Sequence, residues 1–342
     1  MIRVGILGIG FMGMTHYKAW KSVKGAKVTA IFTRDEHKLR GDWRGVKGNF
    51  GGAGGIHNLA SLDRHHKIGE LLSNPNIDVV DICLPTHMHR EVAAAAFHKG
   101  KDVLVEKPLA LTLPDADVMI RAAKETKKLL MVAHVLRFFP TYAEASDIVN
   151  SKQYGKVLGV HLKRVISRPT WVKDASFDAI SQSGGPALDL HIHDTDFIHH
   201  LIGVPQTVRS TGFSEKNGAV TYINTQYVYD DKFKNCAVTA QSGAVAMPTI
   251  SFEHGFDIYL EKATLRFNNI VTGEQLWIYE QDKKRAYRPK RKEAFVAQLQ
   301  HVSDCLTEGK PSKLISGENA RDALSVCLKE IQSVKSGRVV RI

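Results

Sequence analysis

The stretch Gly8-Ile9-Gly10-Phe11-Met12-Gly13 has the spacing G-x-G-x-x-G. It follows a short apolar run, Ile2–Gly8, which predicts a strand, and it leads into Phe11–Val23, which predicts a helix. Glycines at this spacing between a strand and a helix are typical of dinucleotide binding, because the free N–H groups and the dipole at the helix N-terminus favour a pyrophosphate. The stretch therefore predicts a nucleotide-binding parallel sheet.

Each glycine of this turn has its own expected task. Gly8 allows the tight turn, Gly10 lets the backbone approach a pyrophosphate, and Gly13 lets the helix pack closely against the strand. The alternative is a glycine-rich turn without a ligand, and the strand–helix context argues against it. The expected cofactor-binding residues of the turn are Gly8, Gly10, Phe11, Met12 and Gly13.

The first third of the chain alternates short apolar runs with helical stretches, which predicts a doubly wound parallel sheet with helices on both faces. A section rich in glycine, residues 42–59, interrupts it and predicts a loop. We expect a mobile insertion there rather than a phosphate cradle, because the section is not a tight strand-to-helix turn. The expected strands are Lys27–Thr33, Asp78–Leu84, Asp102–Val105 and Leu129–His134, and the expected helices are Glu91–Lys99 and Pro114–Thr126.

After about residue 134 the pattern changes to partly alternating strands with a hairpin signal at Asn217-Gly218. This predicts an α+β domain with a large, open, mostly antiparallel sheet. The expected fold class is α/β, with a Rossmann domain over residues 1–134 and a substrate-binding and oligomerisation domain over residues 135–342, whose last helix is free to pack back on the first domain. The expected strands are Val157–Ile166, Thr207–Phe213, Ala219–Tyr229, Cys236–Val245, Ser251–Leu260 and Thr264–Asn268.

Composition sets further limits. The 342 residues are 43% apolar, enough for two globular domains, and no apolar run predicts a membrane span or an export signal. Four scattered cysteines without a Cys-x-x-Cys pair fit a reducing cytoplasm. The net charge is +12, and we interpret the densest basic run, residues 283–292, as a solvated loop rather than a binding patch. No nucleic-acid motif is present, so neither nucleic acid nor a membrane is an expected partner.

The choice between NAD and NADP depends on the residues about 20 positions past the glycine turn, where NAD-binding chains usually have an acidic residue. Thr33 and Arg34 stand there, and a hydroxyl with a guanidinium suits a 2′-phosphate. Asp35 follows directly, so a slip of one or two residues would restore an NAD site. The expected cofactor is NADP or NAD, with NADP favoured.

Two groups of residues are candidates for chemistry. Lys107, in Glu106-Lys107-Pro108, comes just past the carboxyl end of an expected parallel strand, where residues face the ligand crevice. Asp189 and His193 lie four residues apart on the expected helix Pro186–Ile202 and so share a face. A carboxylate one turn from a histidine orients the ring and favours its charged form, the arrangement of a general base.

Each candidate has a simpler alternative. Lys107 could be a surface lysine before a proline turn. The dense histidines could bind a metal, although His-x-His on one helix points its rings apart and no second cluster complements it, so no metal is expected. A solvated helix face is plausible for Asp196 and His200, and less so for Asp189 and His193. The histidines concerned are His191, His193, His199 and His200.

Over about the first 210 residues the chain resembles the Gfo/Idh/MocA family, named for glucose–fructose oxidoreductase, inositol dehydrogenase and rhizopine catabolism. The matching features occur in the family's order. They are the glycine turn, Cys83-Leu84-Pro85 with His89, the run from Gly100 to Pro108, Arg137-Phe138-Phe139-Pro140, and Gly184-Gly185 followed by Asp189, His193, Asp194 and Asp196.

The resemblance implies reversible oxidation of a sugar or polyol carbinol with NAD or NADP, in a homodimer or homotetramer. Lys107 would bind the substrate hydroxyl, Asp189 would position the substrate and tune His193, and His193 would accept the hydroxyl proton. Pro108 would follow a cis peptide, and His191 could crowd or refine the substrate pocket. The resemblance further implies cofactor contacts from Pro85, Thr86, His89, Glu106, Lys107 and Pro108, and substrate contacts from Lys107, Arg137, Asp189 and His193.

Three functions follow, and the first is favoured because Lys107, Asp189 and His193 are all present. The first is a cytoplasmic NAD(P)-dependent oxidoreductase acting on a sugar, an inositol-like polyol or a related hydroxy compound. The second is a glycoside hydrolase that uses tightly bound NAD for transient oxidation and elimination. The third is a nucleotide sensor without catalysis. Fold analogy alone does not decide among them.

Overall fold

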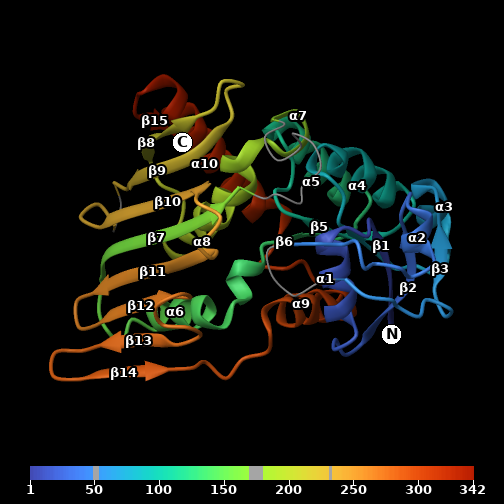
Figure 1. Cartoon of the computed structure of the whole chain (residues 1–342), viewed down its shortest axis with the longest axis horizontal. Coiled ribbons are helices and arrows are strands. Elements are labelled where there is room, and N and C mark those ends of the chain that lie inside the picture. The colour runs from blue at the N-terminus through green and yellow to red at the C-terminus, as the bar shows by residue number, and fades with distance from the viewer. Residues whose placement is uncertain (49–53, 169–179, 231–232) are drawn as a thin grey trace. The chain divides into compact units, whose positions relative to one another are not determined.

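The computed structural model describes residues 1–48, 54–168, 180–230 and 233–342 (Figure 1). The chain divides into two compact units. The first comprises Met1–Val135 with Glu293–Arg321, and the second comprises Leu136–Lys292 with Asp322–Ile342. The first change of unit falls after Val135, and residues 293–321 return to the first unit. The segment that returns to the first unit holds α9 (Ala294–Glu308) and the first residues of α10 (Gly317–Ser336).

Within the described residues, the first unit contains a six-stranded parallel sheet in the order β3-β2-β1-β4-β5-β6. This confirms the predicted doubly wound sheet. The strand order reverses between β1 and β4, and ligands of such sheets bind outside the carboxyl ends of the strands at this reversal. The strands are β1 Ile2–Leu7, β2 Ala26–Phe32, β3 Asp63–His65, β4 Val79–Ile82, β5 Asp102–Glu106 and β6 Leu130–Ala133.

Helices cover this sheet. Helix α4 packs with α5 and β5, whereas α1 packs with α9, which also contacts β1 (Figure 1). Local sequence explains where α5 begins, because the Thr112 hydroxyl accepts the Asp115 N–H and a proline occupies the first turn. The bounds are α1 Phe11–Trp20, α2 Glu36–Leu39, α3 Ile68–Ser73, α4 His89–His98 and α5 Leu113–Glu125.

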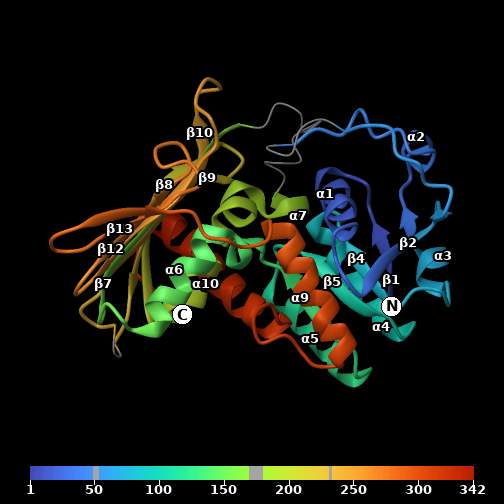
Figure 2. The same cartoon turned by 90° about the horizontal axis from the view of Figure 1, so that it is seen from below.

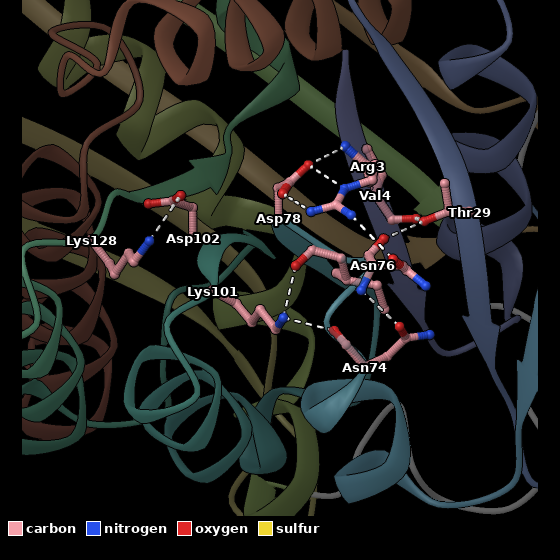
Figure 3. Close-up of polar contacts among 10 residues, drawn as sticks. Arg3, Val4, Thr29, Asn74, Asn76, Asp78, Lys101, Asp102 and Lys128 are labelled. Carbon is pink, nitrogen blue, oxygen red and sulfur yellow. Dashed lines mark hydrogen bonds and ion pairs between the residues drawn. The ribbon is translucent and has the colours of Figure 1, made fainter.

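The amino ends of the strands are held by a polar network (Figure 3). The Arg3 guanidinium donates to Asp78, with Nη2 and Oδ1 2.6 Å apart, and the Lys101 ammonium donates to the carbonyls of Asn74 and Ile77 at 2.8 Å. Lys101 is the second residue of the run from Gly100 to Pro108. The beginning of that run therefore stabilises the sheet, while its end lies at the carboxyl edge, where chemistry is expected.

The glycine-rich section corrects one expectation. Its described flanks are anchored rather than free, because Trp43 is fully buried with its ring 4.8 Å from that of Tyr17 on α1. Backbone bonds from Trp43 N–H to the Gly55 carbonyl and from His57 N–H to the Gly41 carbonyl close the two flanks on each other. Residues 49–53 lie outside the described residues. The number of glycines predicted a loop, but it gave no indication that Trp43 anchors this section.

Within the described residues, the second unit contains a nine-stranded sheet in the order β14-β13-β12-β11-β7-β10-β9-β8-β15. Among the described strands of this sheet, only β7 and β10 pair in parallel, so the predicted mostly antiparallel sheet is confirmed. The strands are β7 Val157–Ser167, β8 Thr207–Ser214, β9 Val220–Val228, β10 Ala237–Ala246, β11 Glu253–Leu260, β12 Thr264–Asn268, β13 Leu276–Tyr279, β14 Lys284–Tyr287 and β15 Val340–Arg341.

One face of this sheet packs against helices. Helix α6 (Pro140–Ser151) and α10 lie on the same side of it (Figure 2), and α8 (Ile192–Ile202) contacts β7 and β10. A short helix, α7, spans Ile180–Ser183. The core between the layers is aromatic, with Tyr142 and Phe197 fully buried.

The basic run at residues 283–292 is not the solvated loop that was expected. Its first part forms β14, an edge strand paired with β13. Lys283 pairs with Glu280 at 2.9 Å, and Arg288 pairs with Glu274 at 2.9 Å. Arg291 bonds to Glu144 at 2.8 Å. Charged side chains on an edge strand discourage pairing with other chains. This role explains the basic run without the need for a bound ligand.

A buried histidine makes the second unit sensitive to acid. His254 Nδ1 lies 3.1 Å from the Tyr142 hydroxyl, and its ring centroid is 5.1 Å from that of Phe252. Burial, reinforced by the charge of Arg164, lowers the pKa of His254 from 6.5 to about 3. The folded state therefore holds the neutral ring, so its stabilisation is complete above pH 6.5 and is lost as the pH falls toward 3.

We expect the wild type to lose about 2 kcal/mol more stability between pH 7 and pH 5 than His254→Phe. Urea unfolding of both proteins at the two pH values measures this. His98→Gln, at an exposed position, is the matched control and should keep the wild-type dependence. Equal losses in wild type and His254→Phe would contradict the prediction.

Candidate active site

The glycine turn connects β1 to α1 and fits a dinucleotide. A Cβ at Gly8 would lie 2.7 Å from the Cys83 carbonyl oxygen, and Gly8 has φ 100°. A Cβ at Gly13 would lie 1.8 Å from the Gly8 carbonyl oxygen, so close packing requires both glycines. A Cβ at Gly10 would meet nothing within 4 Å. Gly10 therefore borders open space at the N-terminus of α1, where a pyrophosphate would lie.

The ribose position is where β2 ends. Thr33 is buried and its hydroxyl accepts the Asp35 N–H at 3.3 Å. The Asp35 carboxylate caps α2, with Oδ1 accepting the N–H groups of His37 and Lys38. Arg34 is exposed. Asp35, the acidic residue that could restore an NAD site, thus caps a helix. This favours Thr33 and Arg34 as the residues at the ribose position.

The residues after β4 lie at the carboxyl edge of the parallel sheet. Pro85 leads into a 3-10 turn, Thr86–Met88, and His89 begins α4. His89 is nearly fully buried, with Nδ1 3.0 Å from the Pro108 carbonyl and Nε2 2.8 Å from the Leu84 carbonyl. Burial lowers its pKa below the ordinary value. His89, expected among the cofactor contacts, therefore joins the segments that follow β4 and β5.

Glu106 is the last residue of β5, and Lys107 follows it. The Lys107–Pro108 peptide is cis, as the resemblance implied. The Lys107 backbone N–H donates to Glu106 Oε2 at 3.2 Å, and Lys107 is half-buried. The expected lysine thus lies at the carboxyl edge of the parallel sheet, next to the strand-order reversal.

The predicted helix of the second unit begins as a π-helix, Ala187–His191, and continues as α8. Every residue between Ala187 and Ile198 is described, and all of them are buried except Asp189 and His193, which are half-buried. Single turns of π-helix are frequent at functional sites. The two residues of the predicted acid–histidine pair are therefore partly exposed, and the rest of this segment is buried.

The buried face of the same segment is held by Glu330 of α10, which motif analysis missed. Glu330 is fully buried; Oε1 lies 3.2 Å from His191 Nε2, and Oε2 accepts the Thr195 hydroxyl at 2.7 Å. Burial opposes the ion pair, but the His191 charge lowers the pKa of Glu330, and Glu330 in turn raises that of His191. A signal was available, since Glu330 falls on the apolar stripe with Ala323 and Cys327.

His191 corrects another expectation. Its ring is fully buried, and Nδ1 lies 2.7 Å from the Ser242 hydroxyl, so it does not crowd a substrate. The Ser242 hydroxyl donates to Asp194 at 2.6 Å, and Arg164 Nε lies 3.0 Å from the same carboxylate. These contacts hold the helix that carries His193 against the sheet.

The solvated-face interpretation is wrong for Asp196, which is fully buried. Arg137 donates to both of its carboxylate oxygens, at 2.8 and 2.6 Å. Arg137 is 4% exposed, so the guanidinium that was expected to contact substrate supports α8 instead. His200, also placed on that face, is half-buried with Nε2 3.1 Å from the Ser146 hydroxyl.

Among the described residues, the helix histidines are not part of a group with metal-ligand spacing. Among the residues that the structure describes, the group with ligand spacing is His16, Asp81 and Cys83 in the first unit.

No helix in the described ranges is long and apolar enough to cross a bilayer.

The parallel sheet and the glycine turn define a dinucleotide-binding protein of the Rossmann class. Residues 2–134 match the family model described as "Oxidoreductase family, NAD-binding Rossmann fold", and residues 142–266 match the "GFO/IDH/MocA C-terminal domain". The chain therefore belongs to the Gfo/Idh/MocA family of oxidoreductases.

Relatives agree with this assignment. The chain is 27% identical to scyllo-inositol 2-dehydrogenase (NAD(+)) of Bacillus subtilis, over 100% of this chain and 96% of the relative. It is 29% identical to an uncharacterized oxidoreductase of Streptococcus pneumoniae over 62% of this chain, and the match spans only 53% of that relative's length. A solved levoglucosan dehydrogenase, in complex with NADH and levoglucosan, has a TM-score of 0.85 at 18% identity, covering 100% of this chain and 99% of its own. The last likeness shows the fold.

Proposed function

We propose that the chain catalyses reversible hydride transfer between NAD(P) and the carbinol carbon of a sugar, an inositol-like polyol or a related hydroxy compound. The observation that carries the proposal is the partial exposure of Asp189 and His193 between Ala187 and Ile198, where every other residue is buried. The names of the inositol and levoglucosan dehydrogenases support the substrate class.

Each of three side chains has a defined role in the proposal. Lys107 binds the substrate hydroxyl through its ammonium group. His193 accepts the hydroxyl proton as the carbinol carbon loses its hydride, and the alcohol becomes a carbonyl. Asp189, one turn before His193, positions the substrate and favours the charged imidazole that results. The bound nicotinamide supplies the hydride acceptor.

NADP is the proposed preference. The capping role of Asp35 and the exposed guanidinium of Arg34 support it. We expect Arg34→Ala to weaken NADP binding by about 10- to 100-fold, the size of a lost charge-assisted hydrogen bond, with NAD binding unchanged. Titration of both nucleotides by fluorescence measures this. Arg121→Ala, at an exposed position on α5, is the matched control, and equal losses for NAD and NADP would refute the preference.

We further propose a cytoplasmic homodimer or homotetramer. All four cysteines lie in the described ranges and are free thiols, which supports a reducing compartment. Exposed apolar residues on strands of the nine-stranded sheet support self-association through it; they include Phe213, Val228, Val245 and Tyr259. Sedimentation should give a dimer or tetramer, and a monomer at all concentrations would remove this part of the proposal.

The experiment is nicotinamide absorbance with purified protein and a panel of sugars, inositols, aldonates and sugar phosphates, run in parallel with NAD and NADP. Net reduction by any member establishes the dehydrogenase. Bound nucleotide without net reduction across the panel would instead direct attention to glycoside cleavage by transient oxidation, or to a sensor.

A further inference from the structure

A buried histidine of the first unit lies between two carboxylates. His16 is on α1 and fully buried. Its Nδ1 is 3.0 Å from both oxygens of Asp81 on β4, and its Nε2 is 3.1 Å from Glu106 Oε1 at the end of β5. One ring therefore connects the helix that follows the glycine turn to two adjacent strands.

The electrostatics favour a charged ring. Burial by itself disfavours the imidazolium, but the charge of Asp81 raises the pKa of His16 well above its ordinary value. Trp20 Nε1 donates to Asp81 Oδ2 at 2.8 Å, which satisfies that carboxylate further. An imidazolium has two N–H groups, whereas a neutral ring has only one. Nδ1 bonds to Asp81, and Nε2 lies within ion-pair distance of Glu106 without forming a hydrogen bond.

The second carboxylate leads to the candidate lysine. While Glu106 Oε1 is paired with His16, Glu106 Oε2 accepts the backbone N–H of Lys107 at 3.2 Å. The Glu106 side chain is almost fully buried, so few arrangements are open to it. Loss of the His16 charge would leave this carboxylate buried without its cation, which is costly and favours rearrangement.

We propose that His16 is a positioning residue for the reaction: its imidazolium fixes the Glu106 carboxylate and, through the Glu106–Lys107 hydrogen bond, the backbone that carries Lys107. The inference rests on the proposed function, in which Lys107 binds the substrate hydroxyl. His16 contacts neither substrate nor cofactor. It acts on turnover through the placement of one side chain.

A metal is the competing use of these residues, because ligand atoms of His16, Asp81 and Cys83 lie within 4.8 Å of one another. Their hydrogen bonds argue against it. The Asp81 oxygens are occupied by His16 and Trp20, and burial raises the pKa of the Cys83 thiol, so a metal would have to displace these hydrogen bonds and the thiol proton. A metal ligand must be the thiolate.

The test is a double-mutant cycle in the full-length protein with His16→Gln, Lys107→Ala and the double variant. His16→Gln should lower kcat by about 10- to 100-fold, the effect of misplacing a catalytic group, while nucleotide affinity changes by less than about threefold. In the Lys107→Ala background the same change should have almost no further effect on kcat, because the group that it positions is absent.

Trp20→Phe is the matched control, since it removes a bond to Asp81 from the same helix and leaves the His16–Glu106 contact. It should lower the thermal midpoint but keep kcat. Additive effects of the His16 and Lys107 substitutions on kcat, or unchanged kcat in His16→Gln, would overturn the proposal. If Lys107→Ala itself keeps full turnover, the proposed function fails at its catalytic set instead, so the two failures are distinguishable.

Two measurements on the wild type hold even if His16→Gln does not fold. Nitrogen NMR of the His16 ring should show both nitrogens protonated at neutral pH, and a neutral ring would overturn the proposal. Elemental analysis of purified protein should find no stoichiometric zinc, and zinc that is lost on alkylation of Cys83 would assign the cluster to a metal.

Discussion

Lys107→Ala is expected to lower turnover by about 10²- to 10⁴-fold, the range for loss of a positioned catalytic group. Nucleotide affinity should stay close to that of the wild type, because the glycine turn and the N-terminus of α1, which hold the pyrophosphate, are unchanged. The physical reason is the placement of Lys107 at the end of β5, past a carboxylate that holds its backbone N–H.

Steady-state kinetics and nucleotide titration on the same preparation measure this. Lys99→Ala removes an exposed lysine next to α4 and is the control for charge alone; it should behave as the wild type. Unchanged turnover in Lys107→Ala would remove Lys107 from the mechanism. A parallel loss of nucleotide affinity would instead show that the lysine serves the cofactor.

Gly10→Val is expected to fold as the wild type and to bind nucleotide about 10- to 100-fold more weakly, the cost of forcing extra carbon atoms into a filled contact. A Cβ at Gly10 would meet nothing within 4 Å, and the φ of −92° and ψ of −161° suit any residue. Gly13→Ala should differ in kind, because its Cβ would lie 1.8 Å from the Gly8 carbonyl oxygen and the backbone must move.

The two variants separate folding from binding within one turn. Thermal unfolding without nucleotide should be unchanged in Gly10→Val and clearly lowered in Gly13→Ala. Titration with NAD and NADP then reports the binding loss of the folded variant. Full nucleotide affinity in Gly10→Val would place the pyrophosphate elsewhere and contradict the site.

Much of the fold could be predicted because local sequence and tertiary structure agree there. The glycine turn, the apolar strands and the change of pattern after residue 134 each led to the right layer of structure. The prediction failed where one residue or a tertiary contact decided the result. Trp43 anchors a section dominated by glycine, and β14 forms from a basic run because β13 lies beside it.

The candidate site could likewise be predicted only where local sequence decides the structure. The partial exposure of Asp189 and His193 agrees with the helical spacing that predicted one shared face for them. The supports of that helix could not be predicted, because they come from distant parts of the chain. Glu330 is 139 residues from His191, and Arg137 is 59 residues from Asp196. From the sequence alone, buried charged residues of this kind cannot be distinguished from charged residues on the surface.

The central claim is net hydride transfer between a carbinol carbon and the nicotinamide. The most direct measurement uses the best substrate of the panel carrying deuterium on its carbinol carbon, with NMR of both products. The account predicts deuterium on the nicotinamide ring and an equal amount of the keto product. A product formed while the nicotinamide pool remains oxidised, or a reduced nicotinamide without deuterium, would contradict it.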